Sequence, residues 1–594
     1  MSVDADTRES RINNTQYFAK SLILFVFLIC GSASAQTDEG AKSVKRPNFL
    51  IVVADDMGWS DIGVLGGEIR TPTLNSLAGR GTLMTDYYVA PTCAPTRSML
   101  MTGVDNHRAG LGVQSGLRAG NQVGINYDGQ LHDGVVTVAE ALASSGYQTY
   151  MAGKWHLSYD TDQEPQQRGF DRSFALVPGG ASHFGDQLSI GPVEIARYIE
   201  DGRDIERLPA DWYSSTGYAD KILEYLDERD PAEPFFAYLT FTAPHDPLQV
   251  PDEWLDRYDG AYDDGPVAVR QARAARQAEL GLIPDSTTLW DYLRFPGWFP
   301  NHAEPWTERS AKQQDIDSRP MEIYASMIEL MDQQIGRVVA YLDEQGELGN
   351  TYIVFFSDNG AGRTGPFVYP GVTKDWLEEN WDQTWVAPGK PRSFTSLGRE
   401  WASAAGTPWK MYKNTVAEGG IRSPLIVAGP GVKAGVFNDA LSHVTDVVPT
   451  LYELAGIDAT THPLFQGKLA PQGVSLMPVL SAQSDSVRES FGVHLFGNRG
   501  LRKGDWKISN VGPPQGNGQW ELFNLADDPG EVRNLAAEMP DKMQELLAEF
   551  DKYLAANDVL LPDKSPLKAK LRALYPGECS WWCETKFKII GWLN

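Results

Sequence analysis

Basic residues are scarce in this sequence relative to acidic ones. The chain has 52 lysines and arginines against 78 aspartates and glutamates, for a formal net charge of −26. Nucleic acids are bound by basic surfaces, so this imbalance argues against a nucleic-acid partner. A densely charged polyanion would also be repelled at low salt, although physiological salt limits that field to about 8 Å. Any anionic ligand must therefore be bound by local positive charge.

Long apolar runs are missing beyond the first 35 residues. A transmembrane helix needs about 20 apolar residues, so we expect no membrane span in the mature protein. The one marked apolar run, residues 22–29, follows Lys20 and precedes the small residues 33–35. This pattern predicts a secretory signal peptide over residues 1–35, then a linker over residues 36–46. The protein is expected to be exported, either to the periplasm or out of the cell.

Cysteine is scarce as well, with four in the chain. Cys30 would leave with the signal peptide, and Cys93 lies in a motif described below. Cys579 and Cys583 remain as an even pair in an exported chain, at a spacing that permits a disulfide. A metal site is the alternative, but no histidine follows His494. We therefore expect a Cys579–Cys583 disulfide in a C-terminal tail, residues 561–594.

A chain of 594 residues is too long for one ordinary core, so a large domain and a smaller one are expected. Four short apolar stretches have the composition of strands buried on both faces. They are residues 47–54, 147–152, 235–241 and 351–357. Helical patterns lie between them, and this alternation predicts a doubly wound, mainly parallel α/β sheet in a domain over residues 47–490. Short strands at residues 500–507 and 520–525, followed by a helix, predict a smaller α+β domain over residues 491–560.

Two further predictions concern the segments between these strands. Proline favours the first turn of a helix, so an amphipathic helix is expected to begin near Ser318 and Pro320. Residues 360–405 are expected to form a long loop. Tryptophans in residues 258–319, namely Trp290, Trp298 and Trp306, either anchor a loop or stack on a ring of the substrate.

Polar or ionisable side chains follow each of the four predicted strands. They are Asp55, Asp56, Lys154, His156, His245, Asp358 and Asn359. Taken singly, an aspartate pair after a strand is usually a solvated turn, and a lone histidine is usually structural. The carboxyl ends of parallel strands meet at one edge of a sheet, where ligands bind. Because all of these side chains are expected to converge at that edge, a functional site is favoured over separate structural roles.

Residues 92–103, Thr-Cys-Ala-Pro-Thr-Arg-Ser-Met-Leu-Met-Thr-Gly, are the most informative stretch. Pro95 suits the first turn of a helix, so a helix is expected from just after Cys93 to near Gly103. Cys93 would lie at the positive end of the helix dipole, and Arg97, about one turn further on, can face the same pocket. The stretch indicates an anion site. A buried or disulfide-bonded structural cysteine is the alternative.

The pattern Cys-x-Pro-x-Arg, from Cys93 to Arg97, resembles the signature of the formylglycine-dependent sulfatases. Further fragments within residues 47–555 occur in the same order as in sulfatases. These fragments are residues 54–56, 153–156, 244–245, 357–360, 413 with 418–420, and 522–525. The resemblance is greatest to bacterial arylsulfatases. The resemblance implies an alkaline-phosphatase-like fold with a small C-terminal domain. It also implies that a separate maturation enzyme oxidises Cys93 to formylglycine, whose hydrated aldehyde is the nucleophile.

The resemblance implies one bound divalent cation. Its ligands would be Asp55, Asp56, Asp358, Asn359 and the hydroxyl derived from Cys93. A shell made of oxygen atoms suits a hard ion such as Ca²⁺, and no soft ligands favoured by zinc are present in this set.

The resemblance also implies roles for the charged residues. Lys154 and Lys413 would hold sulfate oxygens, and Lys410 is a nearby competitor for the second position. Arg97 would hold the formylglycine in its ionised, hydrated form.

Two histidines complete the implied mechanism. His245 would give a proton to the departing oxygen, and His156 would take one from the remaining hydroxyl as sulfate leaves. The expected substrate is an aryl sulfate or a related small-molecule or saccharide sulfate ester. The alternatives are a carbohydrate sulfatase, a phosphonate monoester or phosphodiester hydrolase with the same centre, and an unmodified sulfate-binding protein that is not an enzyme.

Overall fold

The computed structural model describes residues 45–114, 117–158, 161–292, 305–363, 365, 369, 371–384, 387–513 and 515–563. From Arg46 onward these residues belong to one compact unit. The predicted signal peptide, Trp298 and the Cys579–Cys583 pair lie outside the described residues. Among the helices that are described, none combines the length and apolar character needed to span a bilayer.

A large, mainly parallel sheet forms the centre of this unit. Its strands are β1 (Asn48–Ala54), β2 (Thr82–Tyr88), β3 (Gln148–Lys154), β4 (Arg172–Leu176), β5 (Tyr198–Glu200), β6 (Arg203–Ile205), β7 (Phe235–Thr240), β8 (Thr351–Ser357), β9 (Arg422–Ala428), β10 (Val436–Asn438) and β11 (Ser442–His443). The order is β10-β2-β9-β8-β1-β7-β3-β4-β5-β6, with β11 beside β2. β1 pairs in parallel with β7 and β8, and β3 pairs in parallel with β7 and β4. The predicted fold class is confirmed.

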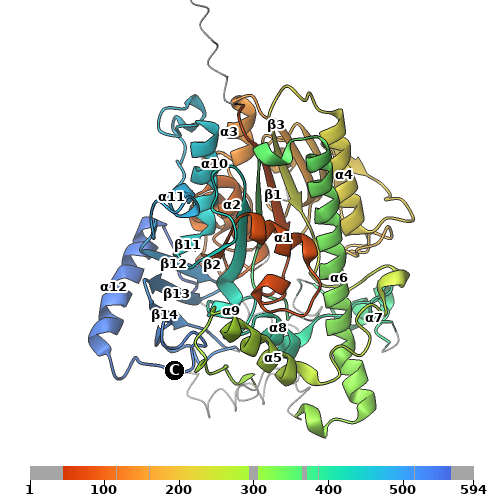
Figure 1. Ribbon diagram of the computed structural model, residues 1–594, viewed down its shortest axis with the longest axis vertical. Helices are drawn as coiled ribbons and strands as arrows, with labels where there is room; N and C mark the ends of the chain where they lie inside the picture. Colours follow the sequence, from red (N-terminus) through yellow and green to blue (C-terminus); the bar gives the residue numbers. More distant parts are fainter. Residues whose placement is uncertain are drawn as a thin grey trace, which may run out of the picture. The chain divides into compact units, whose positions relative to one another are not determined.

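Helices cover both faces of this sheet (Figure 1). α1 (Pro72–Arg80), α4 (Ser214–Glu228) and α6 (Ala311–Glu344) pack on one face, while α2 (Cys93–Thr102), α3 (Val138–Ser144) and α10 (Val447–Ala455) pack on the other. Leu50 and Val52 of β1 face the first group of helices, and Ile51 and Val53 face the second. This alternation explains why β1 is apolar at every position after Asn48, since burial of a large apolar side chain stabilises the fold by about 1.5–3 kcal/mol.

A smaller antiparallel sheet follows near the C-terminus. It consists of β12 (Ser490–Leu495), β13 (Asn498–Lys503), β14 (Trp506–Asn510) and β15 (Glu521–Asn524), paired in sequence order. α12 (Pro540–Ala556) packs on one face through Leu546 and Phe550. The prediction of one strand over residues 500–507 was wrong, because the chain turns at Gly504, whose φ of +55° favours glycine.

The segment between β7 and β8 differs from the prediction at Pro320. α6 begins at Ala311, capped by the Ser310 side chain, and Pro320 lies inside it. A proline inside a helix removes one backbone hydrogen bond, so the helix needs support from outside. Trp401 Nε1 donates to the backbone oxygen of Asp317, in the turn before Pro320, at 2.6 Å. Tertiary packing thus outweighs the local preference of proline for the first turn.

Residues 360–405 are not simply a loop. They contain α7 (Lys374–Asn380) and α8 (Gly398–Ala405). Trp401 of α8 packs edge to face on Trp306, which is buried, as is Trp290. These two tryptophans therefore anchor the insertion. The remaining described α-helices are α5 (Gly265–Glu279), α9 (Glu418–Ile421) and α11 (Met477–Leu480).

Candidate active site

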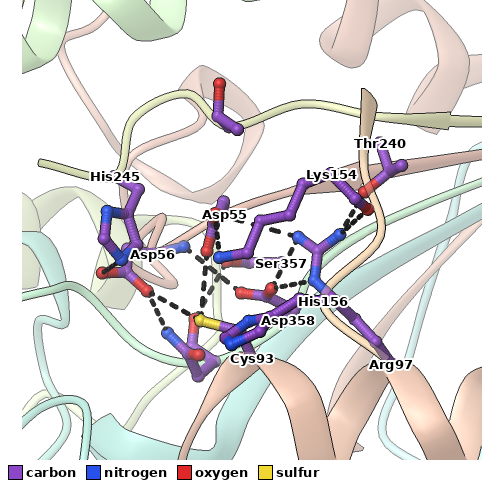
Figure 2. A network of polar contacts seen from close by, with 12 residues as sticks. Asp55, Asp56, Cys93, Arg97, Lys154, His156, Thr240, His245, Ser357 and Asp358 are labelled. Carbon is purple, nitrogen blue, oxygen red and sulfur yellow. Dashed lines mark hydrogen bonds and ion pairs between the residues drawn. The ribbon is translucent and has the colours of Figure 1, made fainter. Parts of the chain in front are cut away.

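The predicted site residues come together at the carboxyl edge of the central sheet (Figure 2). Asp55 and Asp56 follow β1, Asp358 and Asn359 follow β8, Lys154 ends β3, and His156 and His245 follow β3 and β7. These strands are neighbours in the sheet, in the order β8-β1-β7-β3, so their carboxyl ends lie side by side. Asp56 and His156 both have positive φ, at +67° and +57°. The chain is therefore turned sharply where it leaves β1 and β3.

Asp55 lies opposite Lys154 in the centre of the site. Lys154 Nζ is 2.6 Å from Asp55 Oδ2, and both side chains are fully buried. Burial alone would raise the pKa of Asp55, but Lys154, His245 and Arg97 more than offset it and hold the pKa well below its usual range. Asp55 is therefore a carboxylate throughout the physiological range.

Asp56 is contacted from three directions. Lys413 Nζ lies 2.5 Å from Asp56 Oδ1, and Asn359 Nδ2 donates to the same oxygen at 2.7 Å. His245 Nε2 is 3.7 Å from the other oxygen, Oδ2. Lys410, the competitor in the sequence, instead pairs with Glu521 at 3.1 Å and lies over the ring of Phe523. The structure therefore places Lys413, and not Lys410, at the site.

Arg97 holds Asp358 from the adjacent helix. Its Nε and Nη2 lie 2.8 and 2.7 Å from Asp358 Oδ2, and Nη1 donates to the backbone oxygen of Lys154 at 2.9 Å. Nη1 also contacts the hydroxyl of Thr240. Burial and the nearby charge of Asp55 raise the pKa of Asp358 to about 6, despite Arg97. A second positive charge beside Asp358 would lower that pKa again.

Cys93 is the first residue of α2 and its side chain points into the carboxylate cluster. Its Sγ lies 3.3 Å from Asp55 Oδ1 and 3.3 Å from Lys413 Nζ. Burial, together with Asp358 and Asp55, raises the pKa of the thiol well above its usual value. The reactive form of cysteine is the thiolate, so an unmodified Cys93 is a poor nucleophile at this position.

The two histidines have opposite electrostatic environments. Burial and the charges of Lys154 and Arg97 lower the pKa of His156 well below 6.5. Burial also acts to lower the pKa of His245, but Asp56 and Asp55 together outweigh it, and the net pKa is raised. The lowered pKa of His156 suits a proton acceptor, and the raised pKa of His245 suits a proton donor.

Several polar residues of the site were not identified from the sequence. Thr240 contacts Arg97 from the last position of β7, and Ser357, the last residue of β8, accepts from the backbone N–H of Met57 at 3.0 Å. Gln114 Nε2 lies 3.3 Å from His156 Nε2. Thr240 and Ser357 lie at the carboxyl ends of strands. The criterion that identified the other site residues, a place at or just after a strand end, could therefore have identified these two as well. Nothing in the local sequence marks Gln114.

The donor set fits a hard cation. One ligand atom each from Asp55, Asp56, Cys93 and His245 lies within 4.8 Å of the others. Asn359 Oδ1 is buried and has no hydrogen-bond partner among the described residues. A buried orphan oxygen beside several carboxylates is what an oxygen-ligated divalent ion requires. This group of histidine, cysteine and carboxylate ligand atoms contains His245 and not Asp358, which was predicted as a ligand.

The fold and the site together define an α/β protein with a buried cluster of carboxylates, lysines and histidines at the carboxyl edge of its sheet. A family model described as Sulfatase matches residues 47–457. An arylsulfatase of Klebsiella aerogenes is 39% identical over 467 residues, which cover 78% of this chain and 96% of that protein. An uncharacterized sulfatase of Schizosaccharomyces pombe is 38% identical over 533 residues, or 87% and 95% of the two chains. The chain belongs to the sulfatase family and is a sulfuric ester hydrolase.

A solved structure agrees with this fold. It is a protein in complex with its substrate D-glucosamine-2-N,6-O-disulfate, and it superposes with a TM-score of 0.59 at 22% identity. The match covers 88% of this chain and all of that one. At this level of identity the likeness concerns the fold alone.

Proposed function

We propose that this enzyme releases inorganic sulfate from an aryl or related sulfate ester, after a separate maturation enzyme has converted Cys93 to formylglycine. The environment of Cys93 carries the proposal. Its side chain lies between Asp55 and Lys413, at the N-terminus of α2, where the thiol itself is not ionised. Position 93 is well placed for a nucleophile but disfavours a thiolate. This combination fits a nucleophile formed by modification of the Cys93 side chain.

Asp55, Asp56, Asp358 and Asn359 would hold one divalent cation. Oxygen donors of this kind suit Ca²⁺ better than zinc. When present, the cation supplies polarisation of a sulfate oxygen and formylglycine supplies the hydroxyl that attacks sulfur.

Lys154 and Lys413 supply the local positive charge that the acidic surface lacks. Each ammonium has three N–H donors. Lys154 contacts Asp55, and Lys413 contacts Asp56 and Cys93 Sγ, so each keeps at least one N–H for sulfate oxygens. Charge that develops on those oxygens in the transition state is stabilised by donors already fixed in place. Arg97 acts less directly, since it is bound to Asp358.

The histidines move the protons. His245 Nε2 faces the cluster, and its raised pKa keeps a proton there for the departing phenoxide or alkoxide oxygen. The S–O bond breaks, its electron pair goes to that oxygen, and the proton follows. His156, with its lowered pKa, accepts a proton from the hydroxyl at position 93 as sulfate departs.

A saccharide sulfate ester is the second candidate substrate. The solved relative described above was observed with a sulfated glucosamine bound. The export predicted from residues 1–35 suits either substrate.

Initial rates on a panel of aryl sulfates, saccharide sulfates and a phosphonate monoester test the proposal. We expect the greatest kcat/KM on an aryl sulfate. Faster turnover of the phosphonate would contradict it, and faster turnover of a sugar sulfate would favour the second candidate.

A further inference from the structure

Asp246 follows His245 directly and folds back onto its imidazole ring. His245 Nδ1 lies 2.6 Å from the backbone oxygen of Asp246 and 3.0 Å from its Oδ1. Both side chains are buried. One ring nitrogen of His245 is therefore fully engaged by the next residue.

Two hydroxyl groups from a distant part of the chain fix the Asp246 carboxylate. Tyr369 donates to Oδ1 at 2.7 Å, and Ser396 donates to Oδ2 at 2.6 Å. Both residues lie between β8 and α8, more than 120 positions along the chain. Because each carboxylate oxygen has its own hydroxyl donor, the group cannot rotate away from His245 without losing a hydrogen bond.

The backbone of His245 is held as well. His183 Nε2 lies 3.1 Å from the backbone oxygen of His245, and a side chain at Gly180 would begin 3.4 Å from the imidazole carbon Cε1. The ring is thus enclosed on one side while Nε2 remains 3.7 Å from Asp56 Oδ2 in the cluster.

We infer that Asp246 is a positioning residue for His245: it accepts the Nδ1 hydrogen, fixes the ring orientation, and so directs Nε2 at the departing oxygen of the substrate. Tyr369 and Ser396 hold Asp246 in the position that this requires. The arrangement follows the general rule that a proton-transferring histidine is oriented by a third group. The inference rests on the proposed role of His245 as proton donor.

A purely structural role is the alternative, in which Asp246 only ties the segment before α8 to β7. The two roles differ in how the enzyme responds to the leaving group. Proton donation matters most for a poorly acidic phenol and least for a strongly acidic one, because the latter departs readily as an anion. Loss of mere structural support would slow all substrates alike.

The test uses the matured enzyme and a series of aryl sulfates whose phenols decrease in acidity. For Asp246→Asn we expect kcat to fall by less than about 3-fold with the most acidic phenol and by about 10–100-fold with the least acidic one. KM should change by no more than about 2-fold, since Asp246 does not touch the sulfate group. His245→Ala should show a steeper version of the same dependence, and the double variant should be no slower than His245→Ala alone.

Asp458→Asn is the matched control. Asp458 also accepts hydrogen bonds from two hydroxyls, those of Thr460 and Thr461, at 2.7 and 3.1 Å, but it lies exposed in the turn after α10. Its rates should equal those of the parent enzyme.

The outcomes separate the inference from the proposed function. Equal losses on all phenols for Asp246→Asn, or a double variant slower than His245→Ala, would overturn the inference while leaving His245 as donor. Equal losses for His245→Ala would overturn the donor role and the inference with it. If Asp246→Asn does not fold, the double variant Tyr369→Phe/Ser396→Ala takes its place, and a smaller loss with the same dependence is expected; a uniform loss or none would contradict the inference.

Discussion

Arg97 and Asp358 form a fully buried ion pair in which two guanidinium nitrogens converge on one carboxylate oxygen, at 2.7 and 2.8 Å. The pair joins the N-terminal part of α2 to the end of β8, and hence the nucleophile position to a predicted metal ligand. Arg97 therefore organises the site through Asp358.

Arg97→Met should destabilise the fold. Removing one member of a buried ion pair leaves an uncompensated charge, which typically costs about 3–5 kcal/mol. Denaturant unfolding measures this, with Arg337→Met as control. Arg337 pairs with Asp220 at 2.7 Å, but both side chains are about half exposed, and its loss should cost about 0–1 kcal/mol. Equal costs for the two variants would contradict the assignment.

Lys413→Ala should lower kcat/KM on a sulfate ester by about 100-fold or more, because it removes a fixed donor to the sulfate oxygens. Lys410→Ala should change it by less than about 3-fold, since Lys410 pairs with Glu521 and lies over the ring of Phe523. Steady-state kinetics of the two variants, each checked for folding by circular dichroism, measure the difference. A larger loss for Lys410→Ala would reverse the assignment.

Removal of divalent cations should lower thermal stability. Asp55, Asp56 and Asp358 are buried together, and a bound cation relieves their mutual repulsion. Saturation at 100 times the Kd should stabilise the fold by about 2.7 kcal/mol. Thermal unfolding after chelation, then with added Ca²⁺ or Zn²⁺, tests this. Calcium should restore the midpoint and Asn359→Leu should weaken its effect; restoration by zinc alone would contradict the calcium proposal.

Acid should destabilise the fold partly through His443. This histidine is buried, stacks on Phe491 and lies near Arg488; burial first and Arg488 second lower its pKa to about 4. The unfolded chain takes up the proton near pH 6.5, before the folded chain does, so the free energy of unfolding falls as pH drops from 6.5 to 4. The contribution is at most about 3 kcal/mol.

His443→Gln should therefore lose less stability than the parent protein between pH 7 and pH 4.5. Denaturant unfolding at the two pH values measures this. An identical loss in both proteins would show that His443 is not a source of the acid sensitivity.

Much of the fold could be predicted because β1, β7 and β8 are apolar at nearly every position, as burial on both faces requires, and β3 contains the apolar run of residues 150–152. The convergence of polar residues followed from where those strands end. Two features did not follow. Pro320 lies within α6, where Trp401 contacts the preceding turn, and Asp246 meets Tyr369 and Ser396 only in three dimensions. Such long-range contacts leave no periodic or spacing signal in the chain.

The most direct test of the account measures the fraction of formylglycine at position 93 by peptide mass spectrometry, in preparations matured to different extents, together with their aryl sulfatase activity. We predict that specific activity is proportional to the formylglycine fraction and extrapolates to zero when all of position 93 is cysteine. Full activity in a preparation that contains only cysteine there would contradict the account.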